Sequence, residues 1–126
     1  MNETIHNNLY FIRCLLWVSL IAQVQPALAW EKGSCVPPAQ RAALVALYNS
    51  TNGANWTNNS NWLSADESTW FGVEVTGCDI TSIVLIDNNL QGTIPTEIGD
   101  LPNLLDLELS YNKLSGSLPP SVTNLQ

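Results

Sequence analysis

Histidine is almost absent from this chain. The single histidine, His6, lies near the N-terminus, and nothing after it offers an imidazole. Histidine is the commonest general base at neutral pH and a frequent zinc ligand, so Ser-His, Cys-His and histidine-based metal sites are excluded beyond that point. No glycine-rich phosphate loop occurs, and nothing in the spacing of the carboxylates selects the pair that a glycosidase needs. The sequence predicts no enzymatic activity, no metal and no cofactor.

Basic residues are also scarce. Four lysines and arginines stand against eleven aspartates and glutamates, giving a net charge of −7. So acidic a surface repels nucleic-acid phosphates and anionic lipid headgroups, which disfavours both as partners. The chain also lacks the run of about 20 apolar residues that a membrane-spanning helix needs.

A shorter apolar run lies near the N-terminus. Arg13 precedes the apolar residues 14–22, and Ala27-Leu28-Ala29 follows as an A-x-A cleavage pattern. This order predicts a signal peptide over residues 1–29 and a secreted or extracytoplasmic protein. The alternative interpretation is that this N-terminal segment is a buried helix of the folded domain. Cleavage would remove one acid and one base, so residues 30–126, one domain, keep the charge of −7.

Cysteine is rare too. Of three cysteines, Cys14 would leave with the signal peptide, and Cys35 and Cys78 would remain. An even pair in an oxidising compartment predicts a Cys35–Cys78 disulfide. Two free thiols are the alternative.

Near the C-terminus the sequence repeats itself with a period of 24 residues. Apolar residues recur at 80/104, 83/107, 85/109, 90/114, 94/118, 98/122 and 101/125, Asn at 88/112, Gly at 92/116 and Pro at 95/119. Self-similarity of this kind indicates a stack of equal coils. Within each copy, alternating apolar residues such as Ile83 and Leu85 predict a strand with one face in the core.

The spacing L-x-x-L-x-L-x-x-N-x-L, extended by x-G-x-[IL]-P, resembles the plant-type leucine-rich repeat, a class also found in bacterial and protist secreted proteins. The resemblance implies an α/β repeat solenoid. Repeat 1 would span residues 80–103 and repeat 2 residues 104–126, where the array ends without a C-terminal cap.

Residues 30–79 do not repeat. Pro37 and Pro38 predict the start of a helix over residues 39–48, and Asn52-Gly53 predicts its end. The helix, the tryptophans and Trp70-Phe71-Gly72-Val73 resemble the N-terminal cap of plant-type leucine-rich repeat proteins. The cysteines depart from that family's pattern, because Ser68 and Val75 stand where it commonly has cysteine.

Three tryptophans in this segment admit two interpretations. Trp56, Trp62 and Trp70 would either stack on carbohydrate or cover the open end of the solenoid core, and the large apolar area of tryptophan favours the cover. The same segment holds three N-glycosylation sequons, at Asn49, Asn55 and Asn58, which matter only if the source glycosylates its proteins.

Residues flanking the inward strand positions are the candidates for binding. In the family they line the concave face, which commonly carries recognition. The candidates are Ser82, Val84, Ile86 and Asp87 in repeat 1 and Asp106, Glu108, Ser110 and Tyr111 in repeat 2. One hypothesis is a secreted recognition module for a protein, peptide or glycan. The other is a structural N-terminal piece of a longer leucine-rich repeat protein.

The small area of two strands and the unpaired edge of repeat 2 bear on the choice between these hypotheses. Two strands offer a few hundred Å², whereas a standard interface takes about 800 Å² from each partner. Repeat 2 would leave the strand edge around Leu107 and Leu109 unpaired, which predicts marginal stability or self-association through this end.

Overall fold

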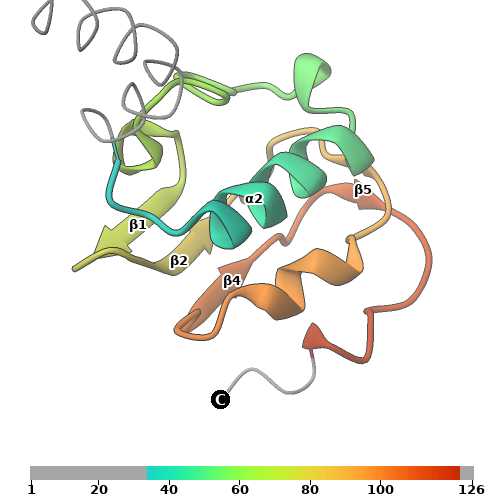
Figure 1. The fold of residues 1–126 in the computed structure, drawn as a ribbon. Coiled ribbons are helices and arrows are strands. Elements are labelled where there is room, and N and C mark those ends of the chain that lie inside the picture. Colours follow the sequence, from blue (N-terminus) through green and yellow to red (C-terminus); the bar gives the residue numbers. More distant parts are fainter. Residues whose placement is uncertain (1–33, 123–126) are drawn as a thin grey trace, which may run out of the picture. The chain divides into compact units, whose positions relative to one another are not determined.

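The computed structural model describes residues 34–122 of the 126-residue chain. Every described residue belongs to the second of the two units into which the chain divides, Ser34–Gln126. The predicted signal peptide and the last residues of repeat 2 therefore lie outside the described residues. In the second unit, helix α2 (Pro38–Ser50) lies against strands β1 (Val73–Thr76), β2 (Asp79–Val84) and β4 (Asp106–Glu108) (Figure 1).

Helix α2 begins at a pair of prolines. Pro37 takes the N-cap position and Pro38 the first helical position, where the missing N–H costs little. Leu44 and Leu47 are fully buried on one side of the helix. After Ser50 the chain turns at Asn52, whose φ of 60° is a left-handed conformation that asparagine tolerates. The predicted helix is present and extends slightly beyond both predicted ends.

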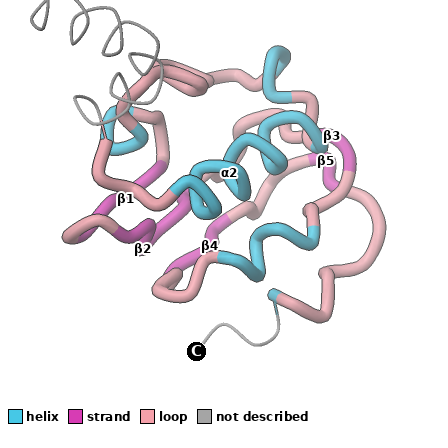
Figure 2. The backbone as a smooth tube through the Cα atoms, viewed as in Figure 1, coloured by secondary structure: helices cyan, strands magenta, loops and turns pink. Residues whose placement is uncertain are grey.

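The two repeats form adjacent parallel strands. Strand β2 pairs with β4 so that Ile83 lies opposite Leu107, its equivalent in the next repeat. Beyond them, β3 (Gln91–Gly92) and β5 (Lys113–Leu114) pair in a second, short parallel sheet (Figure 2). The 3₁₀ segment η4 (Thr96–Asp100) returns the chain from β3 to β4. Each repeat is therefore one coil, stacked on the coil before it.

Asparagine side chains connect successive coils. The Asn112 side-chain oxygen accepts hydrogen bonds from the backbone N–H groups of Asn88 (3.0 Å) and Leu90 (2.9 Å), and its Nδ2 donates to the Leu85 carbonyl at 2.6 Å. One coil earlier, buried Asn88 makes the same kind of reciprocal pair with the backbone of Asn58. The recurring asparagines thus satisfy backbone groups that the turning chain leaves unpaired.

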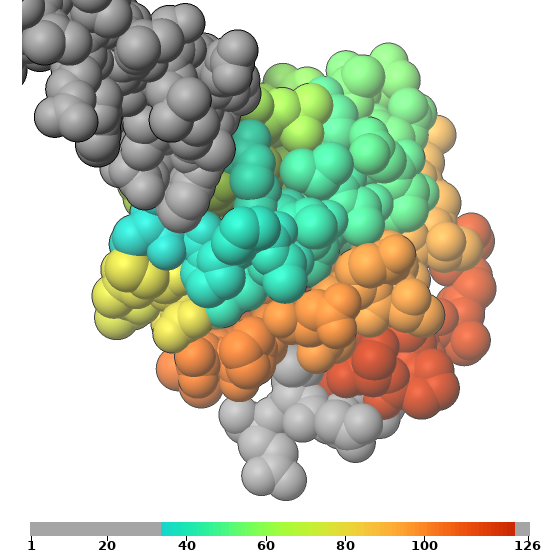
Figure 3. Space-filling model, in the orientation of Figure 1, coloured from blue at the N-terminus to red at the C-terminus, as the bar shows by residue number. Residues whose placement is uncertain are grey.

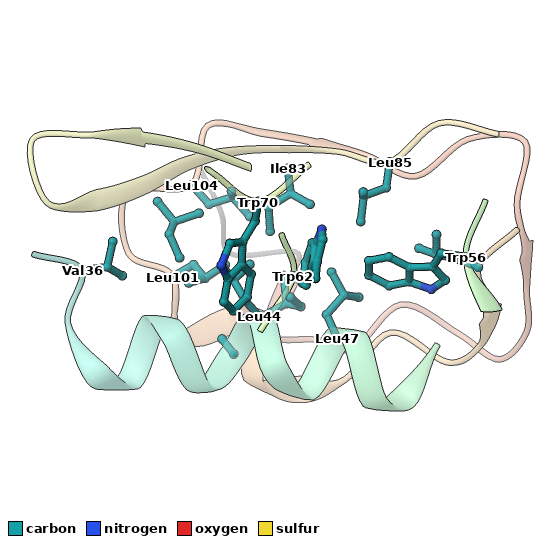
Figure 4. Close-up of a cluster of buried hydrophobic side chains, with 14 residues drawn as sticks. Val36, Leu44, Leu47, Trp56, Trp62, Trp70, Ile83, Leu85, Leu101 and Leu104 are labelled. Atoms are coloured by element: carbon teal, nitrogen blue, oxygen red, sulfur yellow. The ribbon is translucent and has the colours of Figure 1, made fainter. Parts of the chain in front are cut away.

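The core lies between α2 and the strands. Figure 4 shows Leu44 and Leu47 of the helix facing Ile83 and Leu85, with Trp62 and Trp70 filling the space between them. The aromatic rings contact each other: the centroids of Trp56 and Trp62 lie 4.7 Å apart, edge to face, and those of Trp62 and Trp70 lie 4.9 Å apart. Such aromatic packing places a large apolar area in few residues.

Polar and covalent links fasten α2 to its surroundings. Cys35, just before the helix, forms a disulfide with Cys78, just before β2. Gln40 donates to the Asp79 carboxylate at 2.6 Å and accepts from the Ile80 N–H at 2.9 Å. Arg41 forms an ion pair with buried Glu67 of the 3₁₀ segment η3 (Glu67–Thr69).

The second coil is less covered than the first. Ile83, Leu85, Leu90 and Ile98 are fully buried, whereas Leu107, Leu109, Leu114 and Val122, their equivalents one coil later, are only partly buried. Leu118 is 58% exposed. Figure 3 shows α2 and the η4 region side by side on one face, with the second coil at its margin. Among the described residues, nothing stacks on the second coil as it stacks on the first.

Candidate functional site

The predicted binding residues meet on the outward side of the three-stranded sheet. Ile80, Ile83 and Leu85 point into the core, so the residues between them point outward. Ser82 lies opposite Asp106, and Val84 lies opposite Glu108. At the end of the strands the Asp87 N–H donates to the Ser110 carbonyl at 3.0 Å. The structure therefore brings candidates from both repeats onto one surface, called here the strand face: residues 74, 76, 81, 82, 84, 86, 87, 105, 106, 108, 110 and 111.

Large apolar side chains on this face are open to solvent. Leu105 is 77% exposed, Tyr111 83% and Ile86 45%, while Val84 is partly buried. Tyr111 and Asp87 occupy equivalent positions in the two coils, and both have positive φ, 57° and 48°. This left-handed backbone is uncommon for residues other than glycine, and it recurs at the same point of both coils.

The charge of the strand face is of one sign. Glu74, Asp87, Asp106 and Glu108 are exposed there. The one ion pair that the structure shows in residues 34–122, Arg41–Glu67, belongs to α2 and η3. Lys113, the only other base in that range, donates to the Asn89 side chain at 3.0 Å. The four carboxylates of the strand face are thus without a basic partner among the described residues.

Two residues of β1 belong to the strand face but were not predicted. Glu74 lies opposite Ser82, and the Thr76 hydroxyl lies 3.1 Å from the Thr81 hydroxyl. The alternation Val73-Glu74-Val75-Thr76 before Gly77 is a period-two signal that predicts a half-buried strand. The repeat pattern does not reach this segment, which is why the repeat alone could not find β1.

The three tryptophans within residues 34–122 present no exposed ring to a sugar. Trp56, Trp62 and Trp70 are all buried. Their indole N–H groups donate inward, to the carbonyls of Thr51 and Phe71 and to the Ser64 hydroxyl. The packing interpretation of these rings thus agrees with their positions, and the stacking interpretation does not.

The three sequon asparagines are near one another in sequence but differ in exposure. Asn49 and Asn55 are exposed, whereas Asn58 is partly buried. The Asn58 side-chain oxygen accepts from the N–H and hydroxyl of Ser60. Glycosylation of these residues remains a prediction.

No three histidine, cysteine or carboxylate side chains in residues 34–122 are grouped so that they could hold a metal ion. Over the same range, no helix is long and apolar enough to cross a membrane.

Part of the chain is similar in sequence to receptor-like proteins of a plant. The profile of the Leucine Rich Repeat family matches residues 103–125. A probable leucine-rich repeat receptor-like serine/threonine-protein kinase of Arabidopsis thaliana is 49% identical over 43 residues, which are 34% of this chain and 4% of the kinase. Receptor-like protein 5 of Arabidopsis thaliana is 33% identical over 67 residues, 53% of this chain and 25% of that protein. The chain thus spans only a small part of these relatives.

Solved structures show the same fold. The PEPR1–AtPEP1 structure superposes with a TM-score of 0.58 at 23% identity, over 70% of this chain and 13% of that one. The BIR3–SERK2 complex of Arabidopsis thaliana gives 0.54 at 30% identity, over 64% of this chain and 46% of that one. Together with the two stacked coils and their asparagine links, these matches support a leucine-rich repeat protein of the plant type.

Proposed function

We propose that this chain is an extracellular, non-catalytic recognition module that binds a protein or peptide on its strand face. The observation that supports this most directly is the exposure of Leu105, Tyr111 and Ile86 beside the ends of β2 and β4, strands whose other side packs into the core. Exposed apolar groups together on one surface are typical of interaction sites. The BIR3–SERK2 complex shows that a similar fold takes part in an assembly of proteins.

We further propose the division of the chain that the sequence predicts. Residues 1–29 act as a signal peptide, residues 30–79 as a helical, tryptophan-rich N-terminal cap, and residues 80–103 and 104–126 as the two repeats. Two observations support the cap: Trp62 and Trp70 are buried in one core with residues of α2, and the Cys35–Cys78 disulfide ties the start of α2 to the start of β2. The disulfide also favours an oxidising, extracytoplasmic location.

A structural role is the alternative, and the second coil supports it. Leu107, Leu109 and Leu114 are only partly buried, and Leu118 is 58% exposed. In the first coil the equivalent residues are covered by the coil that follows. This surface therefore fits another coil of the same kind, supplied either by a longer chain or by self-association. Fusing a further 24-residue repeat and a polar cap would raise the melting temperature if this surface is the functional one.

Selection from a displayed library of random peptides tests the main proposal. The immobilised protein should enrich peptides above a blank support, and the double variant Leu105→Asp, Tyr111→Asp should lose that enrichment. A matched variant, Ala39→Asp, Ala42→Asp, adds the same charge at exposed positions of α2, which the core separates from the strand face, and should keep it. The proposed binding face is wrong if the native protein enriches no peptide. It is also wrong if the strand-face variant enriches the same peptides as the native protein.

A further inference from the structure

The register of the sheet sets how far apart the carboxylates of the strand face lie. Glu74, Ser82 and Asp106 form one row across the three strands. Neighbouring strands are about 4.8 Å apart, so Glu74 and Asp106 are separated by roughly 10 Å. Glu108 follows Asp106 by two residues on the same strand and the same side, a separation of about 6.7 Å. The carboxylates are therefore spread in a plane and do not converge on one point.

That spacing suits an extended peptide better than a metal ion. Residues 34–122 contain no group of carboxylates close enough to hold a metal. In an extended peptide, by contrast, side chains at alternate positions lie on one side about 6.7 Å apart, which equals the separation of Asp106 from Glu108. Two basic side chains at positions i and i+2 of such a peptide would each meet one carboxylate.

Apolar side chains border these carboxylates along the chain. Leu105 directly precedes Asp106, Tyr111 lies in the turn after β4, and Ile86 lies in the turn after the neighbouring strand β2. Tyr111 is 83% exposed, so its ring is free to take an apolar side chain or the face of a guanidinium. A ligand that carries an apolar residue beside its bases would bury these groups as well as pair the charges.

The strand face offers only negative charges to a ligand. Arg41 is already paired with Glu67, and Lys113 with Asn89, so no base among the described residues competes for Glu74, Asp106 or Glu108. A field of one sign attracts ligands of the opposite sign and repels acidic ones.

From these observations, and resting on the proposed function of the strand face, we propose that its partner is an extended cationic peptide segment. The segment carries lysine or arginine at two alternate positions, facing Asp106 and Glu108, and an apolar residue next to them, facing Tyr111 and Ile86. Where the segment carries a third basic side chain, that side chain pairs with Glu74.

The composition of the peptides enriched in the library selection tests this proposal. We expect lysine or arginine at positions i and i+2 with an apolar neighbour. One enriched peptide is then synthesised, and its dissociation constant is measured by calorimetry. The variant Asp106→Asn, Glu108→Gln should weaken binding about three- to thirty-fold, the range expected for two exposed ion pairs. Added salt should weaken binding to the native protein more than to this variant.

A matched variant controls for net charge. Glu97→Gln, Asp100→Asn removes the same two charges from exposed positions on η4, which packs along α2 rather than on the strand face. It should leave the dissociation constant within about twofold, as expected for charges beyond a Debye length.

The remaining outcomes separate this inference from the proposed function. Enrichment of neutral or acidic peptides that still need Leu105 and Tyr111 would overturn the cationic partner and leave recognition by the strand face standing. Equal weakening by the two charge variants would also overturn it, because the effect would then come from net charge alone. If no peptide is enriched at all, both proposals fail.

Discussion

Replacing Asn112 by alanine should destabilise the protein strongly, because its side chain connects the two coils. It accepts from the N–H groups of Asn88 and Leu90 and donates to the Leu85 carbonyl. Alanine leaves these three backbone groups without their partner. An unsatisfied polar group costs about 1–3 kcal/mol when it is buried. Because Asn112 is only partly buried, we take the low end of this range for each of the three groups. The free energy of unfolding should therefore fall by about 3 kcal/mol.

Urea unfolding followed by tryptophan fluorescence is the appropriate assay, since Trp56, Trp62 and Trp70 are buried in the native protein. Asn103→Ala is the matched control, because Asn103 is exposed and its replacement removes the same amide; it should change stability by less than about 0.5 kcal/mol. Equal stability of the two variants would refute the assignment of Asn112 as the connection between coils.

Three further predictions concern the scaffold and its export. Gly92→Ala should lower the free energy of unfolding by about 3 kcal/mol or more, because φ is 119° and the new Cβ would lie 2.1 Å from the Ser50 carbonyl oxygen. Gly77→Ala, with no atom within 4 Å of the new Cβ, should cost about 1–2 kcal/mol, and reversal of this order in urea unfolding would contradict the structure. Opening the disulfide, which spans a sequence separation of 43, by replacing Cys35 and Cys78 with serine should cost about 4 kcal/mol, whereas alkylation of both thiols in unreduced native protein would show that no disulfide exists. N-terminal sequencing of exported protein should begin at Trp30, and a retained Met1 would exclude cleavage after residue 29.

The repeated part of the fold could be predicted residue by residue. A 24-residue period with fixed apolar positions specifies which side chains face the core, and the same period pairs Ile83 with Leu107, as the parallel strands do. The alternation within each repeat identified the outward residues from Ser82 to Tyr111. Periodicity works here because each coil repeats the environment of its neighbour.

The segment before the repeats was less predictable because its contacts are unique. Arg41 and Glu67 are 26 positions apart, and only the path of the loop between them brings them together. Likewise, the sequence favoured the tryptophans as a cover of the core over a carbohydrate contact, but it could not identify Tyr48 as the ring that stacks on Trp62. Glu74 was missed because the hairpin formed by β1 and β2 has no counterpart in the repeat, although its alternating residues carried the signal.

The most direct test of binding by the strand face is to map the contact surface by NMR. Backbone amide shifts of the labelled protein would be recorded during titration with a peptide enriched in the selection. We expect the largest changes on the strand face, at Glu74, Val84, Asp106, Glu108 and Tyr111. Changes centred instead on Leu114, Leu118 and Val122 would show that the partner covers the second coil, and the account of this chain as a recognition module would be wrong.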